Sequence, residues 1–317
     1  MIERRDQLFP RPADETDKPA MKKWATDLTE AFFSFASNRP TKFGVYRVKA
    51  RSEIDELFSH YEYDLTDAAA HLDGEGVTRL AQAIYLLKTG AYESIWWRVE
   101  NRIHELAEQE GALDMYNVVN IIRAFTRSQD NRSSASDKLY IHLEPTILKN
   151  IDSVSARDLG HLMYGYSIRD VGNPEIYKAF EKRFTQLVDE EAPFDHAFLS
   201  NAIYYMLFRE NDDEKLWKAI IEATIIQKDI LPLMHYKPFK ISRYYLTKRF
   251  PEWDLHEYTE SFYYADRYWN AAALDEYYRA DFKYLEFKSF LNRKCLVYPI
   301  CFMTLWNTFN LHYVFYE

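Results

Sequence analysis

Four polar side chains that could bond to a ligand recur along the chain at a regular interval. They are Gln82, Asn120, His161 and Asn201, spaced 38 to 41 residues apart. Amide and imidazole groups donate and accept hydrogen bonds, so a row of them could read the edges of RNA bases. The same groups could instead bond between successive helices or face solvent, because amides readily satisfy nearby backbone groups. We favour the structural interpretation of this row.

The other reactive residue types form no recognisable local catalytic or metal-binding pattern. The nine histidines are scattered, and no HExxH, GxSxG, Walker A or GxGxxG sequence is present. Cys295 and Cys301 lie six residues apart without a second pair, which argues against a zinc site or a disulfide framework. Asp254 and His256 lie close together, but no nucleophile or ligand partner accompanies them. We therefore expect no enzyme activity, no cofactor and no metal site.

The charge balance argues against a protein that mainly binds phosphate backbones. The 317 residues carry a net charge of −9, whereas nucleic-acid binding usually requires a basic excess. One window, 236–249, has five basic residues and no acidic one. These are Lys237, Lys240, Arg243, Lys248 and Arg249. The window could contact acidic lipid headgroups or RNA, but we favour a solvated or partner-facing basic surface.

Helices must position the polar row, because apolar residues recur around it at offsets of i, i+3, i+4 and i+7. The matched rows are Leu80, Val118, Leu159 and Leu199; Ala83, Ile121, Leu162 and Ala202; Ile84, Ile122, Met163 and Ile203; and Leu87, Phe125, Tyr166 and Met206. This spacing is typical of a helix that buries one face. A unit that recurs at about 40 residues is the signature of a stacked helical array.

A second helix follows in each unit and begins with an aromatic residue. These aromatic residues are Trp96, Tyr140, Tyr177 and Trp217. The candidate caps of the first helices are Gly76, Asp114, Ser155 and Asp195. Because Pro145 is unfavourable inside a helix that begins at Tyr140, we expect that helix to start near Glu144.

These patterns predict an all-α protein, built as an α-solenoid of two-helix repeats with an aromatic-rich helical C-terminal region. The low glycine count of 8 argues against an all-β fold. The expected parts are an extended tail over 1–23, a helical cap or degenerate repeat over 24–75, the array over 76–230, the aromatic-rich region over 231–294 and an uncharged segment over 295–317. The aromatic-rich region either contacts neighbouring proteins or caps the end of the array.

The segment 295–316 contains no Asp, Glu, Lys or Arg. About 20 helical residues cross a hydrocarbon core, and basic and aromatic residues often mark its borders. Two interpretations remain open, a membrane-embedded helix with its polar face against a protein, or a terminal element packed on soluble neighbours. The candidate partner or membrane contacts are Arg293, Lys294, Trp306, Asn307, Asn310 and His312.

The first helices resemble those of a known group of organellar helical-repeat proteins. Residues 120–126, NIIRAFT, and 161–167, HLMYGYS, are similar to the repeated first helix of heptatricopeptide- and octotricopeptide-type proteins, including FAST-kinase-like ones. The resemblance covers roughly residues 76–228. Tyr205 and Leu86 replace the family's small residue in two units, and no basic RAP-like domain follows. The resemblance implies either organellar RNA binding or recruitment into mitochondrial membrane complexes or ribosomes.

The acidic balance, the aromatic C-terminal third and the uncharged segment favour recruitment into a complex. We expect a non-catalytic accessory subunit, a scaffold, of a mitochondrial inner-membrane complex such as a respiratory-chain complex or ATP synthase, on the matrix side. Its partners would be other protein subunits, with lipid contact at the C-terminus and no nucleic acid. The alternative is an organellar RNA-binding or mitoribosome-associated helical-repeat protein.

Overall fold

The computed structural model describes residues 9–37, 59–87, 93–127, 137–227 and 236–267. Within these ranges the regular structure is helical and contains no strand, so the all-α prediction is confirmed there. None of the helices in these ranges has the length and apolar character needed to cross a membrane. The C-terminal contact candidates Arg293, Lys294, Trp306, Asn307, Asn310 and His312 lie outside the described residues, as do Cys295 and Cys301.

Helix pairs follow one another along the described chain, after an N-terminal helix, α2 (Lys18–Ser37). The first helices of the pairs are α4 (Gly74–Leu87), α6 (Met115–Arg127), α8 (Ala156–Arg169), α10 (His196–Arg209) and α12 (Tyr236–Arg249). The second helices are α5 (Glu93–Ala107), α7 (Asp137–Asn150), α9 (Pro174–Asp189), α11 (Glu214–Ile226) and α13 (His256–Arg267). Residues 59–68 are also helical, and two short 3-10 helices are η2 (Ala69–His71) and η3 (Ile151–Ser153).

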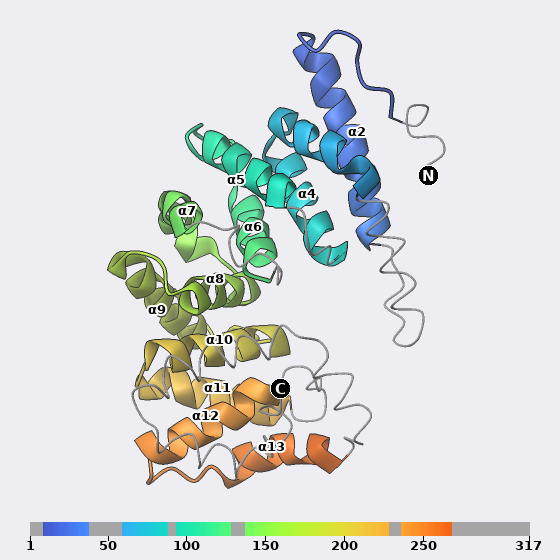
Figure 1. Cartoon of the computed structure of the whole chain (residues 1–317). Helices are drawn as coiled ribbons and strands as arrows, with labels where there is room; N and C mark the ends of the chain where they lie inside the picture. Colours follow the sequence, from blue (N-terminus) through green and yellow to red (C-terminus); the bar gives the residue numbers. More distant parts are fainter. Residues whose placement is uncertain (1–8, 38–58, 88–92, 128–136, 228–235, 268–317) are drawn as a thin grey trace.

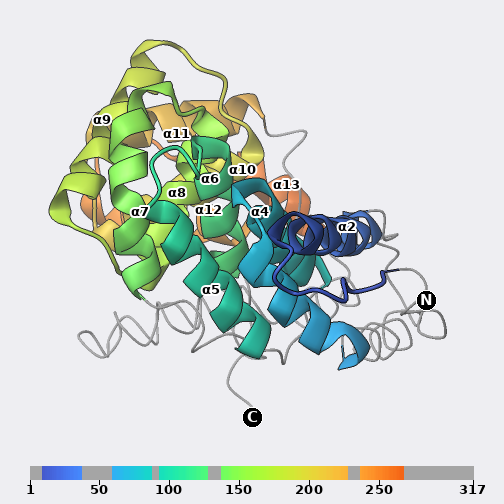
Figure 2. The same ribbon diagram turned by 90° about the horizontal axis from the view of Figure 1, so that it is seen from above.

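Each helix packs on its partner in the pair and on the corresponding helix of the next pair. The N-terminal helix α2 contacts α4, and the first helices contact one another in the order α4, α6, α8, α10 and α12. The second helices contact one another in the order α5, α7, α9, α11 and α13. The pairs therefore follow each other through the molecule from α2 to α13 (Figure 1). Seen from above, α7 and α9 lie on the opposite side of the molecule from α2 (Figure 2).

The apolar rows form the core between these helices. Among the matched positions whose side chains the structure describes, every one is buried. The aromatic residue near the start of each second helix is buried as well, and Trp96, Tyr140 and Trp217 are almost completely enclosed. One face of each helix is therefore removed from water, which is the main source of stability for helices of this length.

Side-chain caps begin the first helices, with one difference from the prediction. The oxygens of Asp114, Ser155 and Asp195 accept hydrogen bonds from backbone N–H groups three residues later, at 2.7, 3.2 and 2.7 Å. Gly76 is not a cap, because α4 begins earlier and the Gly76 N–H donates to Asp73 Oδ1 at 3.0 Å. Aspartate supplies the acceptor that glycine lacks.

The second helix of the second pair does not begin where the sequence predicts. It starts at Asp137 and contains Pro145, so the expected start near Glu144 is wrong. Proline removes the N–H that would bond the Ile141 carbonyl. Both Pro145 and Ile141 are exposed, so water can satisfy that carbonyl, while Leu143 and Ile147 hold the opposite face in the core.

The N-terminal helix begins inside the region expected to be an extended tail. The helix α2 starts at Lys18, where Asp17 Oδ1 accepts the Ala20 N–H at 3.1 Å. An aspartate cap with a proline in the first turn is a helix start signal. The described residues before α2 contact the same chain, since Arg11 forms an ion pair with Asp67 at 2.7 Å.

Candidate functional site

The repeated polar row lies at contacts between successive first helices. Gln82 Nε2 donates to Asn120 Oδ1 at 2.7 Å, which joins α4 to α6. Asn120 Nδ2 in turn donates to the Tyr116 carbonyl at 2.9 Å. In α8 and α10, His161 Nδ1 and Asn201 Nδ2 are 3.2 Å apart. Asn120, His161 and Asn201 are buried, so these atoms bond helix to helix and present little surface to a base edge.

A row of glutamates that the sequence analysis did not single out makes further contacts between pairs. Glu144 of α7 accepts two hydrogen bonds from Asn173, which precedes α9. The backbone N–H donates to Oε1 at 2.9 Å and the side-chain amide donates to Oε2 at 2.5 Å. Only 3% of Glu144 is exposed. A buried carboxylate is stable only when its oxygens are bonded, and Asn173 bonds both.

The next pair repeats this contact. Glu181 of α9 accepts from Asn211 Nδ2 at 2.9 Å and from the Tyr205 hydroxyl at 3.2 Å. Glu144 and Glu181 each lie four residues after the aromatic residue of their helix, and each bonds an asparagine between the next two helices. The signal in the sequence is the matching position of Glu100, Glu144 and Glu181.

Two tyrosines join the same pairs through backbone carbonyls. The Tyr166 hydroxyl donates to the Tyr140 carbonyl at 2.7 Å, and the Tyr205 hydroxyl donates to the Tyr177 carbonyl at 3.5 Å. Burial raises the pKa of Tyr140 and of Tyr177 to about 12. Burial, reinforced by Glu144 and Glu181 respectively, also raises the pKa values of Tyr166 and Tyr205. These phenols therefore remain protonated hydrogen-bond donors at neutral pH.

Within three pairs, a side chain in the C-terminal half of the second helix, or directly after that helix, donates a hydrogen bond to a backbone carbonyl. The carbonyl belongs to the residue two positions before the first helix of the same pair. Such bonds connect the segment before the first helix to the second helix in three of the described pairs. They join Arg102 Nε to Leu72 at 2.8 Å, Arg183 Nε to Val154 at 3.1 Å, and Gln227 Nε2 to Phe194.

Two of the histidines that the sequence suggests are scattered lie together. The Nδ1 atoms of His104, on α5, and His142, on α7, are 2.7 Å apart. On its other side, His104 Nε2 lies 3.6 Å from Glu100 Oε1. The two histidines are 38 residues apart in the sequence, whereas the aromatic residues that begin their helices, Trp96 and Tyr140, are 44 apart. The repeat pattern therefore gives no signal from which the pair could have been found.

The other candidate residues have ordinary structural contacts. In the basic window, Arg249 forms an ion pair with Asp212, and the side chains of Lys237 and Lys240 lie outside the described part. Asp254 Oδ1 accepts the His256 N–H at 2.9 Å and so caps α13. The Asp254–His256 pair therefore has a helix-starting role.

No protein-family model matches the chain, and no curated protein matches it. Across the described ranges, no group of three or more His, Cys, Asp or Glu side chains is arranged to hold a metal ion. The resemblance to organellar helical-repeat proteins therefore rests on the helix sequences alone. What the geometry offers is a set of recurring bonds that lock successive helix pairs together.

Proposed function

We propose that the chain is a non-catalytic scaffold whose helix pairs form an α-solenoid of two-helix repeats. The observation that supports this most directly is the recurring contact of Glu144 with Asn173 and of Glu181 with Asn211. In a solenoid each unit contacts mainly its neighbours, so a contact needed at one junction is needed again at the next. Buried polar networks of this kind make an array rigid and specify its geometry.

A rigid array is useful when its surface binds other proteins. Several large apolar side chains of the described part remain exposed, including Trp97 at 61% and Ile141 at 47%. Trp97 lies on α5 and Ile141 on α7, which pack against each other. Aromatic and aliphatic side chains of this size supply much of the binding energy when a partner covers them. We take this surface as a contact for a neighbouring subunit.

We propose that the scaffold is an accessory subunit of a mitochondrial inner-membrane complex, such as a respiratory-chain complex or ATP synthase, on the matrix side. The support comes from the sequence: the resemblance of the first helices, the net charge of −9 and the uncharged segment 295–316 after Arg293 and Lys294. Its partners are other protein subunits, and segment 295–316 is the candidate lipid contact.

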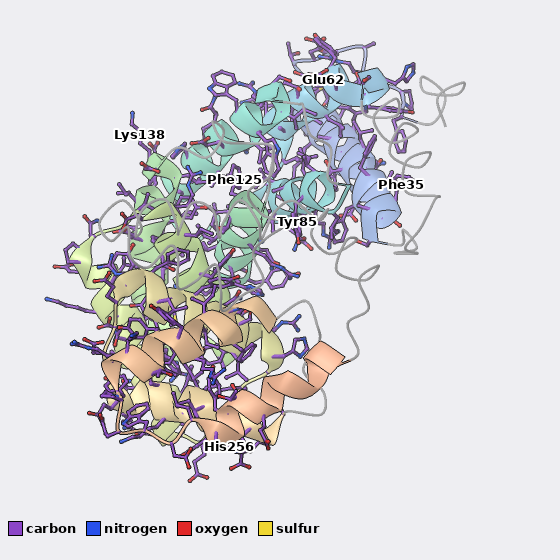
Figure 3. The ribbon with its side chains drawn as sticks, turned by 60° about the horizontal axis from the view of Figure 1, so that its bottom comes forward. Phe35, Glu62, Tyr85, Phe125, Lys138 and His256 are labelled. Carbon is purple, nitrogen blue, oxygen red and sulfur yellow. The ribbon has the colours of Figure 1, made fainter. Side chains whose placement is uncertain are left out.

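Native gel electrophoresis of mitochondria in mild detergent, followed by mass spectrometry, tests this function. The tagged chain should migrate with the subunits of one large membrane complex. Trp97→Asp and Ile141→Asp should weaken that association. His256→Gln is the control, because His256 is exposed on α13, far from Lys138 and the rest of α7 (Figure 3). Migration of the wild-type chain alone, near 37.9 kDa, would contradict the proposal.

Organellar RNA binding is the second candidate function. The exposed side chains of Arg243 and Lys248 on α12 favour it, together with the resemblance. Phosphate contacts make the logarithm of affinity fall linearly with the logarithm of salt concentration. A steep salt slope that becomes shallower in Arg243→Gln would support RNA binding. Absence of measurable binding at low salt would leave the protein scaffold as the better explanation.

A further inference from the structure

We propose that His104 and His142 form a binding site for a transition-metal dication, with Zn²⁺ as the representative ion. The site goes beyond a purely adhesive scaffold, because an ion here would join α5 to α7 by coordinate bonds. These helices belong to different pairs. Metal binding would therefore strengthen one junction of the array in response to ion concentration.

The two imidazole rings face each other edge to edge. Their ring centroids are 5.0 Å apart and their planes differ by 28°. The centroid distance exceeds the Nδ1–Nδ1 distance of 2.7 Å by 2.3 Å, which is close to two ring radii. The two nitrogens therefore lie between the rings and point toward each other. In the metal-free protein this geometry requires one Nδ1 to carry a proton and the other to accept it.

The carboxylate of Glu100 indicates which ring accepts. Its Oε1 lies 3.6 Å from His104 Nε2, and the Glu100 side chain is buried. A carboxylate on this side favours a proton on Nε2 and leaves the Nδ1 lone pair of His104 directed toward His142. At 3.6 Å the contact is an electrostatic one, and a shortening to hydrogen-bond distance would give the order of carboxylate, imidazole and ion that orients most histidine ligands of metals.

An ion fits between the rings after both rings turn. Zinc–nitrogen bonds of about 2.0–2.1 Å in a tetrahedral site place two ligand nitrogens roughly 3.4 Å apart. The Nδ1 atoms, now 2.7 Å apart, must separate by about 0.7 Å, and each ring must turn by roughly 35° so that the two lone pairs converge on the ion. On binding, the Nδ1 proton of neutral His142 moves to its Nε2 through solvent, so no net proton is lost. Water fills the remaining coordination positions, because both side chains are partly exposed.

The donor atoms determine the class of ion. Two neutral imidazole nitrogens suit Zn²⁺, Ni²⁺ and Cu²⁺, with affinity rising to Cu²⁺ along the first transition row. Mg²⁺ and Ca²⁺ prefer oxygen ligands and should not bind here.

Calorimetric titration of the full-length protein with Zn²⁺, after treatment with a chelator, tests the site. We expect one binding event, and an affinity at least tenfold lower in His104→Gln and in His142→Gln. Thermal unfolding should show the same pattern, since an ion that binds only the folded state raises Tm. With Cu²⁺ as the probe, electron paramagnetic resonance should show coupling to two imidazole nitrogens in the wild-type protein and one in either variant.

His256→Gln is the matched control, since His256 is exposed and lies on α13, away from α5 and α7. Its Zn²⁺ affinity at the proposed site should equal that of the wild-type protein. If one histidine variant does not fold by circular dichroism, the other decides the question, because the site needs both ligands. Equal Zn²⁺ affinity in the wild-type protein and in a folded His104 or His142 variant would overturn the proposal, as would the absence of any binding.

Discussion

Two successive junctions use the same residue types but differ in burial. We call them the Glu144 junction (Glu144, Asn173, Tyr140 and Tyr166) and the Glu181 junction (Glu181, Asn211, Tyr177 and Tyr205). In the first, the carboxylate is buried and its hydrogen bonds are 2.5 and 2.9 Å long. In the second, the carboxylate is half-buried and its bonds are 2.9 and 3.2 Å. The comparison shows that one contact can recur while its contribution to stability varies with burial.

One position of the first helix explains part of this difference. Gly165 of α8 and Tyr205 of α10 are equivalent, and both face the preceding pair. A Cβ added at Gly165 would lie 2.6 Å from Ile122 Cγ2, so glycine allows α6 and α8 to approach closely. In α10, Tyr205 fills the corresponding space, and its hydroxyl donates a hydrogen bond to Glu181. The large residue at this position adds a hydrogen bond to the preceding pair, while α8 and α10 still approach closely at Gly160, where an added Cβ would lie 3.0 Å from Phe198 Cδ2.

Removing the glutamates should give the largest difference between the junctions. Glu144→Ala should lower the free energy of unfolding by about 3 kcal/mol, because it removes two hydrogen bonds to a buried carboxylate and leaves a cavity in its place. Glu181→Ala should cost about 1 kcal/mol, since water can reach the half-buried groups. Chemical denaturation followed by circular dichroism measures both values.

Glu222→Ala is the control for these two variants, because Glu222 is exposed on α11. It should change stability by less than about 0.5 kcal/mol. Equal losses for Glu144→Ala and Glu181→Ala would show that burial does not separate the two junctions.

A methyl group added to α8 should distinguish the contact with α6 from the contact with α10. At Gly165, the new Cβ would lie 2.6 Å from Ile122 Cγ2 and 2.8 Å from Thr126 Oγ1, atoms close to their own backbone. Gly165→Ala should therefore cost about 2 kcal/mol by overpacking. At Gly160 the nearest atoms are Phe198 Cδ2 at 3.0 Å and Cα at 3.2 Å.

The steric overlap of the new methyl group is smaller at Gly160 than at Gly165. Its cost should be nearly offset by the higher helix propensity of alanine, about 1 kcal/mol. Gly160→Ala should thus leave the unfolding midpoint almost unchanged. The two variants add the same methyl group to the same helix, against different neighbouring helices and at different distances, so each serves as the control for the other. A larger loss at Gly160 than at Gly165 would contradict the close approach of α6 and α8.

The sequence predicts the helices and most of their starts better than it predicts the contacts between them. Asp114, Ser155 and Asp195 cap helices as expected, because a cap bonds atoms only three residues away. The predicted start of α7 was wrong, because the free energy gained by burying Leu143 and Ile147 outweighs the cost of Pro145 inside the helix.

The histidine pair shows why contacts between helices were missed. His104 lies eight residues after Trp96, whereas His142 lies two residues after Tyr140. The two residues are therefore not at equivalent positions, and only the offset between α5 and α7 brings them together. Such offsets depend on side-chain packing along the whole contact, which helical periodicity does not specify.

Alkaline pH should destabilise the Glu144 junction through its buried phenol. The pKa of Tyr140 is about 12 in the folded protein, against about 10 in the unfolded chain. Above pH 10 the unfolded chain therefore loses a proton that the folded protein retains. The resulting stability is complete below pH 10 and is lost as the pH rises through about 12, with about 1.4 kcal/mol gone at pH 11.

Denaturation at pH 9 and pH 11 measures this loss, and Tyr140→Phe should remove that part of the pH dependence. At the Glu181 junction Tyr177, whose pKa burial also raises to about 12, should give a loss of similar size, even though Arg209 lies over its ring at 4.0 Å and favours the phenolate. An unchanged pH dependence in Tyr140→Phe would contradict this assignment.

Removing one hydroxyl from each junction should give the smallest effects. Tyr166→Phe deletes the 2.7 Å bond to the Tyr140 carbonyl and leaves that carbonyl buried, so it should cost about 1 kcal/mol. Tyr205→Phe deletes a 3.5 Å contact with the Tyr177 carbonyl and a 3.2 Å bond to half-buried Glu181, and should cost about 0.5 kcal/mol. Both variants keep the aromatic ring, so packing is the same and the hydroxyl alone is tested. Combining each with the alanine variant of its glutamate measures the coupling within a junction, which should be larger for Tyr166 with Glu144 than for Tyr205 with Glu181 if burial sets the strength of these contacts.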